Sequence, residues 1–235
     1  MAHSYANQAA DGRRAATDSG LRDYLLRVYN YMAGGLALTG LVAYYGAASG
    51  VYASVAGSGW IWLVLLAPLA LVLLLSFRIE RISLGAAQLA FWAYGALVGL
   101  SLSGIFLLYT GESIARVFFV SAGTFAATSL YGYMTRADLS RFGSFLFMGV
   151  IGILVAMLVN MFLKSPALQL TVSVLGVVVF VGLTAYDTQR IKSIYVEGEE
   201  ASTAGKKSIL GALALYLDFL NLFLMLMRLM GNRRQ

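Results

Sequence analysis

The sequence predicts an all-α integral membrane protein built as a bundle of seven transmembrane helices. Sixty per cent of its 235 residues are apolar and only 12% are charged, whereas a soluble domain is roughly half apolar and about a quarter charged. The apolar residues also gather in long runs, and a helix needs about 20 of them to cross a hydrocarbon core of about 30 Å. Seven such runs use most of the chain, which leaves no room for a separate soluble domain.

The apolar runs begin after a polar N-terminal arm, residues 1–26, and make residues 27–235 a single transmembrane domain. Within the arm, residues 19–27 have the composition of a short amphipathic helix. Each run is expected to be a helix because it is long, continuous and lacks the alternation of a strand. The seven predicted spans are residues 28–48, 60–77, 84–109, 114–135, 142–163, 167–189 and 209–229.

Residue usage excludes most catalytic and metal-binding chemistry. The chain has no cysteine, and its only histidine is His3 in the arm. Thiolate catalysis, Ser-His catalysis and multi-histidine metal sites are therefore excluded. The basic residues lie at the ends of the predicted helices and form no continuous stripe, which argues against nucleic acid as a partner. We expect no enzymatic activity and no cofactor, with the lipid bilayer as the main partner.

Basic residues between the predicted spans indicate the orientation of the chain. With a cytoplasmic N-terminus, two basic residues, Arg116 and Lys164, fall in the outer segments and twelve fall in the cytoplasmic ones. These twelve are Arg13, Arg14, Arg22, Arg27, Arg78, Arg81, Arg136, Arg141, Arg190, Lys192, Lys206 and Lys207. Such an excess is the positive-inside pattern of membrane proteins. The tail departs from it, because seven complete crossings put Arg228, Arg233 and Arg234 outside. We expect a full crossing by the last helix, with a re-entrant helix as the alternative.

Glycine and proline positions indicate how the helices pack. Gly95 and Gly99 form a GxxxG pattern in the third run, and small residues of this kind let helices approach closely in a membrane. The pattern indicates a tightly packed bundle and is also a candidate contact face for a partner protein. Pro68 lies inside the second run, where it should bend the helix or leave one backbone carbonyl without its usual donor.

Two acidic residues lie inside apolar runs. Asp218 is well inside the last run, and Asp187 is near the cytoplasmic end of the sixth. A charged side chain at the centre of a bilayer costs roughly 2.5–3.5 kcal/mol on insertion scales, so it normally has a partner or faces a wet cavity. Taken singly, Asp187 could be an interfacial carboxylate paired with Arg190 or Lys192, and Asp218 could be a hydrogen-bonding group between helices.

The two aspartates are expected to meet, because the sixth and seventh spans are consecutive and antiparallel. Two carboxyl groups in one low-dielectric site do not both ionise cheaply, so the pair titrates as a unit and responds to pH. Arg78, at the end of the second span, is the candidate counter-charge. Thr184 and Asn221, each about one helical turn from an aspartate, are candidate supporting polar residues.

Three segments of the chain resemble the Bax inhibitor-1 family, also called the transmembrane BAX inhibitor motif family. They are residues 214–224 (ALYLDFLNLFL) in the last run, 185–192 (AYDTQRIK) at the end of the sixth, and 129–144 (SLYGYMTRADLSRFGS) between the fourth and fifth. The resemblance extends from about residue 22 to the C-terminus. The short tail is similar to that of bacterial inner-membrane members.

The resemblance implies two three-helix layers around a central C-terminal helix and a pH-sensitive calcium leak controlled by two aspartates. Asp187 and Asp218 occupy the positions of those aspartates. Arg78 is the nearest match to an arginine that joins them in the family. The acidic insert at residues 197–200 (EGEE) separates the two aspartates by more residues than the resemblance leads us to expect.

Three functions are compatible with these features. The leading one is a cation leak channel whose aspartates hold the last helix across the pore. Calcium would bind Asp187 and Asp218 only transiently, because a calcium site needs more oxygen ligands than two carboxylates supply. The first alternative is a membrane regulator that binds a protease or another membrane complex. The second is a proton-coupled transporter, since buried acids also build proton relays.

Overall fold

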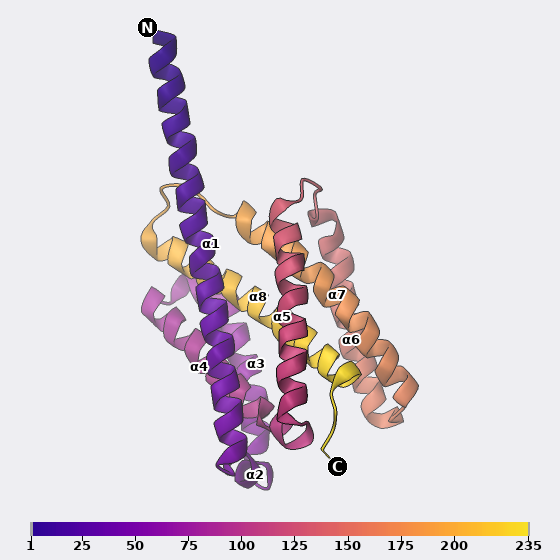
Figure 1. Ribbon diagram of the computed structural model, residues 1–235. Coiled ribbons are helices and arrows are strands. Elements are labelled where there is room, and N and C mark those ends of the chain that lie inside the picture. Colours follow the sequence, from indigo (N-terminus) through magenta and orange to yellow (C-terminus); the bar gives the residue numbers. More distant parts are fainter. Residues whose placement is uncertain (1, 235) are drawn as a thin grey trace.

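The chain folds into a bundle of α-helices in the computed structural model, which describes the backbone of residues 2–234 and the side chains of residues 19–234. The elements, in chain order, are α1 (Ala2–Ala48), α2 (Val51–Ala56), α3 (Ile61–Arg78), the 3₁₀ turn η1 (Ile79–Arg81), α4 (Leu84–Leu108), α5 (Gly111–Met134), α6 (Ser140–Leu163), α7 (Pro166–Ser193) and α8 (Ala201–Met230). Over residues 2–234 the structure contains no β-strand (Figure 1).

Six helices, α3 to α8, are long and apolar enough to cross a membrane, which makes the chain an integral multi-pass membrane protein. They confirm six of the seven predicted spans. The last predicted span, residues 209–229, lies within α8, which begins eight residues earlier at Ala201 because its first two turns are polar yet helical. The remaining predicted span, residues 28–48, lies in the C-terminal part of α1, where tyrosines and glycines dilute the apolar residues.

The predicted N-terminal arm lies partly outside what the structure describes, since the side chains of residues 1–18 are not among the described ones. Residues 19–27 belong to α1. Tyr24 and Leu25 are buried there, while Arg22 and Asp23 are exposed. This part of α1 therefore has one apolar face on the bundle and one polar face on its outside.

Short polar residues begin three of the spans. The side chains of Ser83, Thr110 and Ser165 each accept a hydrogen bond from a backbone N–H in the first turn of α4, α5 and α7 respectively. These caps satisfy donors that a helix start leaves unpaired. Pro166 follows Ser165 at the first position of α7, where its missing N–H costs nothing. The turns between spans are thus short and sharply defined.

Pro68 is accommodated by a hydrogen bond from a neighbouring helix. A proline at this position cannot donate to the carbonyl oxygen of Val64, four residues earlier. The hydroxyl of Ser101 in α4 donates to that oxygen instead, at 2.8 Å. The carbonyl that the sequence predicted to lose its donor is therefore satisfied inside the bundle, as the membrane interior requires.

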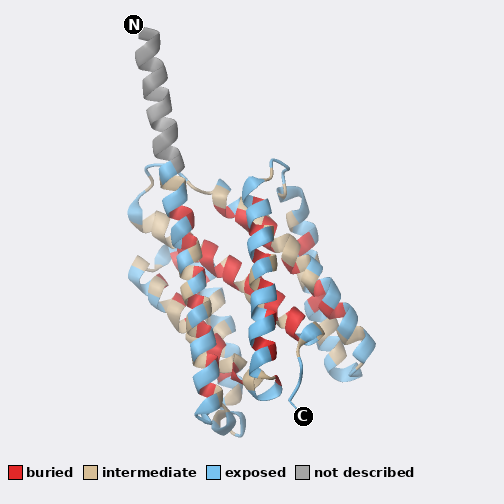
Figure 2. Ribbon diagram, in the orientation of Figure 1, coloured by how far each residue is buried: buried red, intermediate tan, exposed pale blue. Residues whose placement is uncertain are grey.

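The core of the bundle lies around α8. Of the apolar part of α8, 67% is buried, against 33% or less in each of the other five spans. α8 packs against α1, α4, α5 and α7, while α3 packs on α4 and α6 packs on α7 (Figures 1 and 2). The outer helices α3 and α6 expose large side chains such as Phe77 and Phe162. Lipid is the solvent that suits those surfaces.

The GxxxG pattern in α4 faces α1. A Cβ atom built on Gly99 would lie 2.7 Å from the backbone oxygen of Thr39, and one on Gly95 would lie 3.4 Å from that of Gly35. The two glycines thus allow α1 and α4 to pack at backbone distance. Our expectation that this face is available to a partner protein is wrong, because α1 covers it.

The last helix runs between the two ends of the bundle. At its start, the ammonium group of Lys206 donates to the carbonyl oxygen of Glu80 in η1, at 3.2 Å. After its end, the carbonyl oxygen of Asn232 accepts from the N–H of Thr110, at the turn between α4 and α5. These two turns lie at opposite ends of α4, so α8 runs the full length of α4, which favours a complete crossing over a re-entrant helix.

A buried hydrogen bond joins α8 to α1. The hydroxyl groups of Tyr216 and Thr39 are 2.7 Å apart, and Thr39 also donates to the carbonyl oxygen of Gly95. We expect Tyr216→Phe to lower the free energy of unfolding by about 1 kcal/mol, the usual net value of such a bond. Thermal unfolding in detergent would measure it. Tyr94→Phe is the matched control, because no described residue hydrogen-bonds to the Tyr94 hydroxyl. Equal losses in both variants would contradict the prediction.

Candidate functional site

Asp218 lies in the interior of the bundle. Only 4% of its surface is exposed, and Leu215, Phe219 and Leu222 around it on α8 are buried as well. Because α8 is surrounded by α1, α4, α5 and α7, the Asp218 carboxyl group is withdrawn both from lipid and from bulk water. A carboxyl group in such a place needs a hydrogen-bonding partner.

The partner is Asp187 on α7. This residue is partly buried, and its carboxyl group lies close enough to that of Asp218 for the two to act on each other. A hydrogen bond between two carboxyl groups requires a proton on one of them, because an ionised carboxylate only accepts. The buried Oδ2 of Asp218 accepts no hydrogen bond from the described residues, so a proton on either carboxyl group would supply the missing donor. The two residues, called the aspartate pair below, are therefore placed where one shared proton would link α7 to α8.

Two glycines hold α7 and α8 close on either side of the aspartate pair. A Cβ atom on Gly211 of α8 would lie 3.3 Å from Ile191 of α7. One on Gly176 of α7 would lie 2.8 Å from Met225 of α8. Side chains at these positions would separate the helices, and a separation of even an ångström or so would break a carboxyl–carboxyl hydrogen bond. The contact between the aspartates thus depends on the packing of two long helices.

Arg190, and not Arg78, is the cation that acts on the aspartate pair. Arg190 lies one helical turn after Asp187 on α7 and attracts its carboxyl group electrostatically. Arg78 is exposed at the end of α3, which packs on α4 on the outside of the bundle. The structure therefore does not bring Arg78 to the pair, although the sequence made it the candidate counter-charge.

The candidate supporting residues bond within their own helices. Thr184 is fully buried, and its hydroxyl donates to the carbonyl oxygen of Phe180 at 2.8 Å. The side-chain amide of Asn221 donates to the carbonyl oxygen of Leu217, also at 2.8 Å. Both residues thus satisfy their polarity locally, as serine, threonine and asparagine often do in membrane helices.

Sequence reasoning missed a chain of hydroxyl groups beside Asp187. The Ser129 hydroxyl on α5 bonds to that of Thr188 on α7, at 3.0 Å, and also to that of Tyr29 on α1. Thr188 follows Asp187 directly in the chain and is 1% exposed. Single hydroxyl groups in apolar runs carry little signal, and only the fold brings these three helices together.

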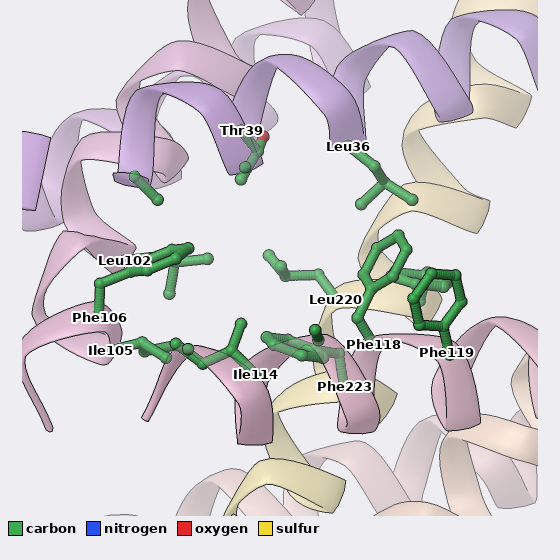
Figure 3. A pocket seen from close by; sticks show the side chains of 15 residues that line it. Leu36, Thr39, Leu102, Ile105, Phe106, Ile114, Phe118, Phe119, Leu220 and Phe223 are labelled. Carbon is green, nitrogen blue, oxygen red and sulfur yellow. The ribbon is translucent and has the colours of Figure 1, made fainter. Parts of the chain in front are cut away.

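An apolar cavity of about 300 Å³ lies between α1, α4, α5 and α8 (Figure 3). Leu36, Phe118 and Phe223 point into it from three of these helices. Thr39 is the one polar side chain in its lining, and its hydroxyl is already bonded to Tyr216 and Gly95. Neither aspartate lines this cavity. It therefore provides no polar route to the pair.

The fold and the site define a class: a multi-pass helical membrane protein with two neighbouring aspartates on adjacent helices, one of them fully inside the bundle. Residues 21–235 match the family described as "Inhibitor of apoptosis-promoting Bax1". The chain therefore belongs to the Bax inhibitor-1 family, as the sequence motifs predicted.

Relatives of the chain in bacteria match it over nearly its whole length. It is 51% identical to the inner membrane protein YbhL of Escherichia coli over 220 residues, which cover 92% of this chain and 94% of the relative. It is 49% identical to the uncharacterized protein RP147 of Rickettsia prowazekii, with 92% of each chain covered. An uncharacterized protein of Caulobacter vibrioides is 44% identical, with 96% of this chain and 95% of the relative covered.

Proposed function

We propose that this protein is a pH-sensitive cation leak channel, with calcium as the leading permeant ion, closed by the aspartate pair. The observation that carries the proposal is the buried carboxyl group of Asp218 on α8, without a donor from the described residues and next to the carboxyl group of Asp187 on α7. A buried acid in a membrane span is costly, and ion or proton pathways are where such residues are usually found. The proposal involves no catalysis and no cofactor.

The architecture that goes with this function has seven spans. α1 would cross the membrane as the seventh, since it packs along α4 and α8, which are both spans. α1, α3 and α4 would then form one layer and α5, α6 and α7 the other, with α8 between them. In this arrangement the central helix closes the space through which ions pass.

The chain is proposed to lie in a bacterial inner membrane with its N-terminus in the cytoplasm. The name of the E. coli relative supports the location. The distribution of basic residues supports the orientation, since the end of the bundle that carries the start of α8 also carries most of the arginines and lysines between spans. Asp187 would then lie toward the cytoplasmic side and respond to cytoplasmic pH.

The proton on the aspartate pair would control the closed state. With one proton, the pair has a neutral donor and an anionic acceptor, which is the strong, charge-assisted form of a hydrogen bond. Loss of that proton leaves two negative charges in contact, and a second proton removes the charge from the acceptor. Both changes weaken the link between α7 and α8 and so favour opening.

Calcium would compete with the proton and bind only briefly. Carboxylate oxygens suit calcium, but the ion takes six to eight oxygen ligands when it is held tightly. Over the described part of the chain, no group of three or more acidic or histidine side chains could hold a metal. Two carboxylates are therefore suited to weak, transient binding of an ion that passes through, and not to tight binding.

The first test measures calcium entry into liposomes that contain the purified protein and a trapped calcium dye, over a series of pH values. The rate should be lowest at the pH at which the aspartate pair holds one proton and should rise on both sides of it. The rate should also keep increasing as the calcium concentration is raised, whereas the rate of a transporter would saturate at a low concentration. A rate equal to that of protein-free liposomes at every pH would contradict the proposal and favour a partner-binding role.

A further inference from the structure

A second polar site lies at the end of the bundle opposite Asp187. It is a pocket of about 270 Å³ lined by Met157, Asn160, Met161, Gln169, Val172 and Arg228. The pocket lies where α6 ends at Leu163, α7 begins at Pro166 and α8 nears its end at Met230. Ends of spans are at the level of lipid headgroups, so the pocket is reached both from that layer and from water.

Arg228 has no acidic partner in this pocket. The pocket lining contains no aspartate or glutamate. The contact that the structure gives the Arg228 guanidinium is to the sulfur of Met157, at 3.1 Å, and a thioether is a weak acceptor. The guanidinium has five N–H groups in a planar fork that matches the oxygens of a phosphate or a carboxylate. Among the described residues, the Arg228 guanidinium therefore does not bind the kind of anionic oxygens that it binds most strongly.

Two side-chain amides add donors beside Arg228. The Oδ1 of Asn160 accepts from the N–H of Ser165 at 2.9 Å, which leaves its Nδ2 as a donor. Gln169 is partly buried and has no side-chain hydrogen bond to a described residue. An arginine that only anchors a helix at the interface needs neither a pocket nor amides. Donors from α6, α7 and α8 that line one pocket without a carboxylate among them suit an anion.

The charges around the pocket favour the same ligand. Among the described side chains, this end of the bundle carries Arg116, Lys164, Arg228, Arg233 and Arg234 but one acid, Glu112. The ion pair that the described residues form, Lys207 with Glu199, lies at the other end. We propose that the pocket binds a phosphate-type anion through Arg228, Asn160 and Gln169. The anion is either the headgroup of an anionic phospholipid or free phosphate.

The test is retention of phosphatidylglycerol by the purified protein, measured by native mass spectrometry. Arg228→Gln should weaken retention about tenfold, which corresponds to one lost charge-assisted hydrogen-bonding group. Arg116→Gln is the matched control: it removes the same charge from the same end outside the pocket and should retain the lipid as the unmodified protein does. The proposal would be overturned if the Arg228 and Arg116 variants retained the lipid equally and if, in the phosphate experiment described next, the response to phosphate did not depend on Arg228.

Two further measurements separate the sources of the anion and guard against misfolding. Inorganic phosphate is added to lipid-free protein in detergent, and the unfolding temperature is recorded. A rise that Arg228→Gln abolishes assigns the pocket to a free anion, whereas Arg228-dependent retention of phosphatidylglycerol without that rise assigns it to lipid. Gln169→Leu keeps the cation and removes one amide, so it should weaken the same binding several-fold. Unchanged binding in the Gln169 variant would show that the side-chain amides do not contribute to the proposed site.

Discussion

Liposomes that contain the Asp218→Asn variant should leak calcium at a rate that no longer rises at alkaline pH. The asparagine amide is a permanent donor, so it keeps a hydrogen bond to ionised Asp187 where the original pair has lost its proton. Asp218→Leu removes the partner altogether and should raise the rate about tenfold or more at the pH of the original minimum. That factor corresponds to loss of one charge-assisted hydrogen bond from the closed state.

Asp138→Asn is the matched control for these variants. Asp138 is exposed in the turn before α6, where it accepts hydrogen bonds from the backbone N–H and the hydroxyl of Ser140. These bonds, that of the hydroxyl first, lower the pKa of Asp138, which is thus ionised throughout the pH range of the experiment. Its replacement should leave the pH profile unchanged. If the Asp218 variants also kept the original profile, the aspartate pair would have no role in closing the channel.

Gly132→Ala should destabilise the protein more than alanine at any of the other glycines described above. Gly132 is buried in α5, and a Cβ atom there would lie 2.8 Å from the Cα atom of Ala185 on α7. Backbone atoms cannot rotate away as a side chain can, so the two helices must separate. The free energy of unfolding should fall by about 2 kcal/mol, in the usual range for overpacking, and thermal unfolding in detergent measures it.

The same substitution at Gly123 is the control for Gly132. Gly123 lies in α5 as well, but a Cβ atom there meets nothing within 4 Å. Alanine favours a helix by up to about 1 kcal/mol over glycine, so Gly123→Ala should be neutral or slightly stabilising. Similar unfolding temperatures for the two variants would mean that α5 and α7 are not in backbone contact beside Asp187.

Most of the fold and half of the site could be predicted from the sequence, for a simple physical reason. A membrane span must be a long apolar run, and an acid inside such a run stands out, so the spans and Asp218 were visible without a structure. The polar start of α8 was missed because residues 201–208 do not need to be apolar to be helical. Arg78 was favoured because charge, position along the chain and the family resemblance suggested it, but α3 packs on α4 and leaves Arg78 exposed, whereas Arg190 lies one turn from Asp187 on α7 itself.

Contacts between distant residues were beyond sequence reasoning. Tyr29, Ser129 and Thr188 are ordinary residues that become a chain of hydroxyl groups only when α1, α5 and α7 meet. The bond from Ser101 to the carbonyl oxygen of Val64 is similar, because Pro68 predicted the missing donor but not which residue supplies it. The residue type indicates that a polar group needs a hydrogen-bonding partner, and the three-dimensional packing determines which residue supplies it.

The attachments of α8 limit the way in which it can move. Lys206 ties its first turns to Glu80, and Asn232, just past its last turn, is tied to Thr110. A piston-like slide by one helical turn, about 5.4 Å, would rupture both tethers at once. A small roll about the long axis of α8 turns Asp218 away from Asp187 without moving the two ends along that axis. The proposed opening is therefore expected to be a rotation of α8 and not a slide.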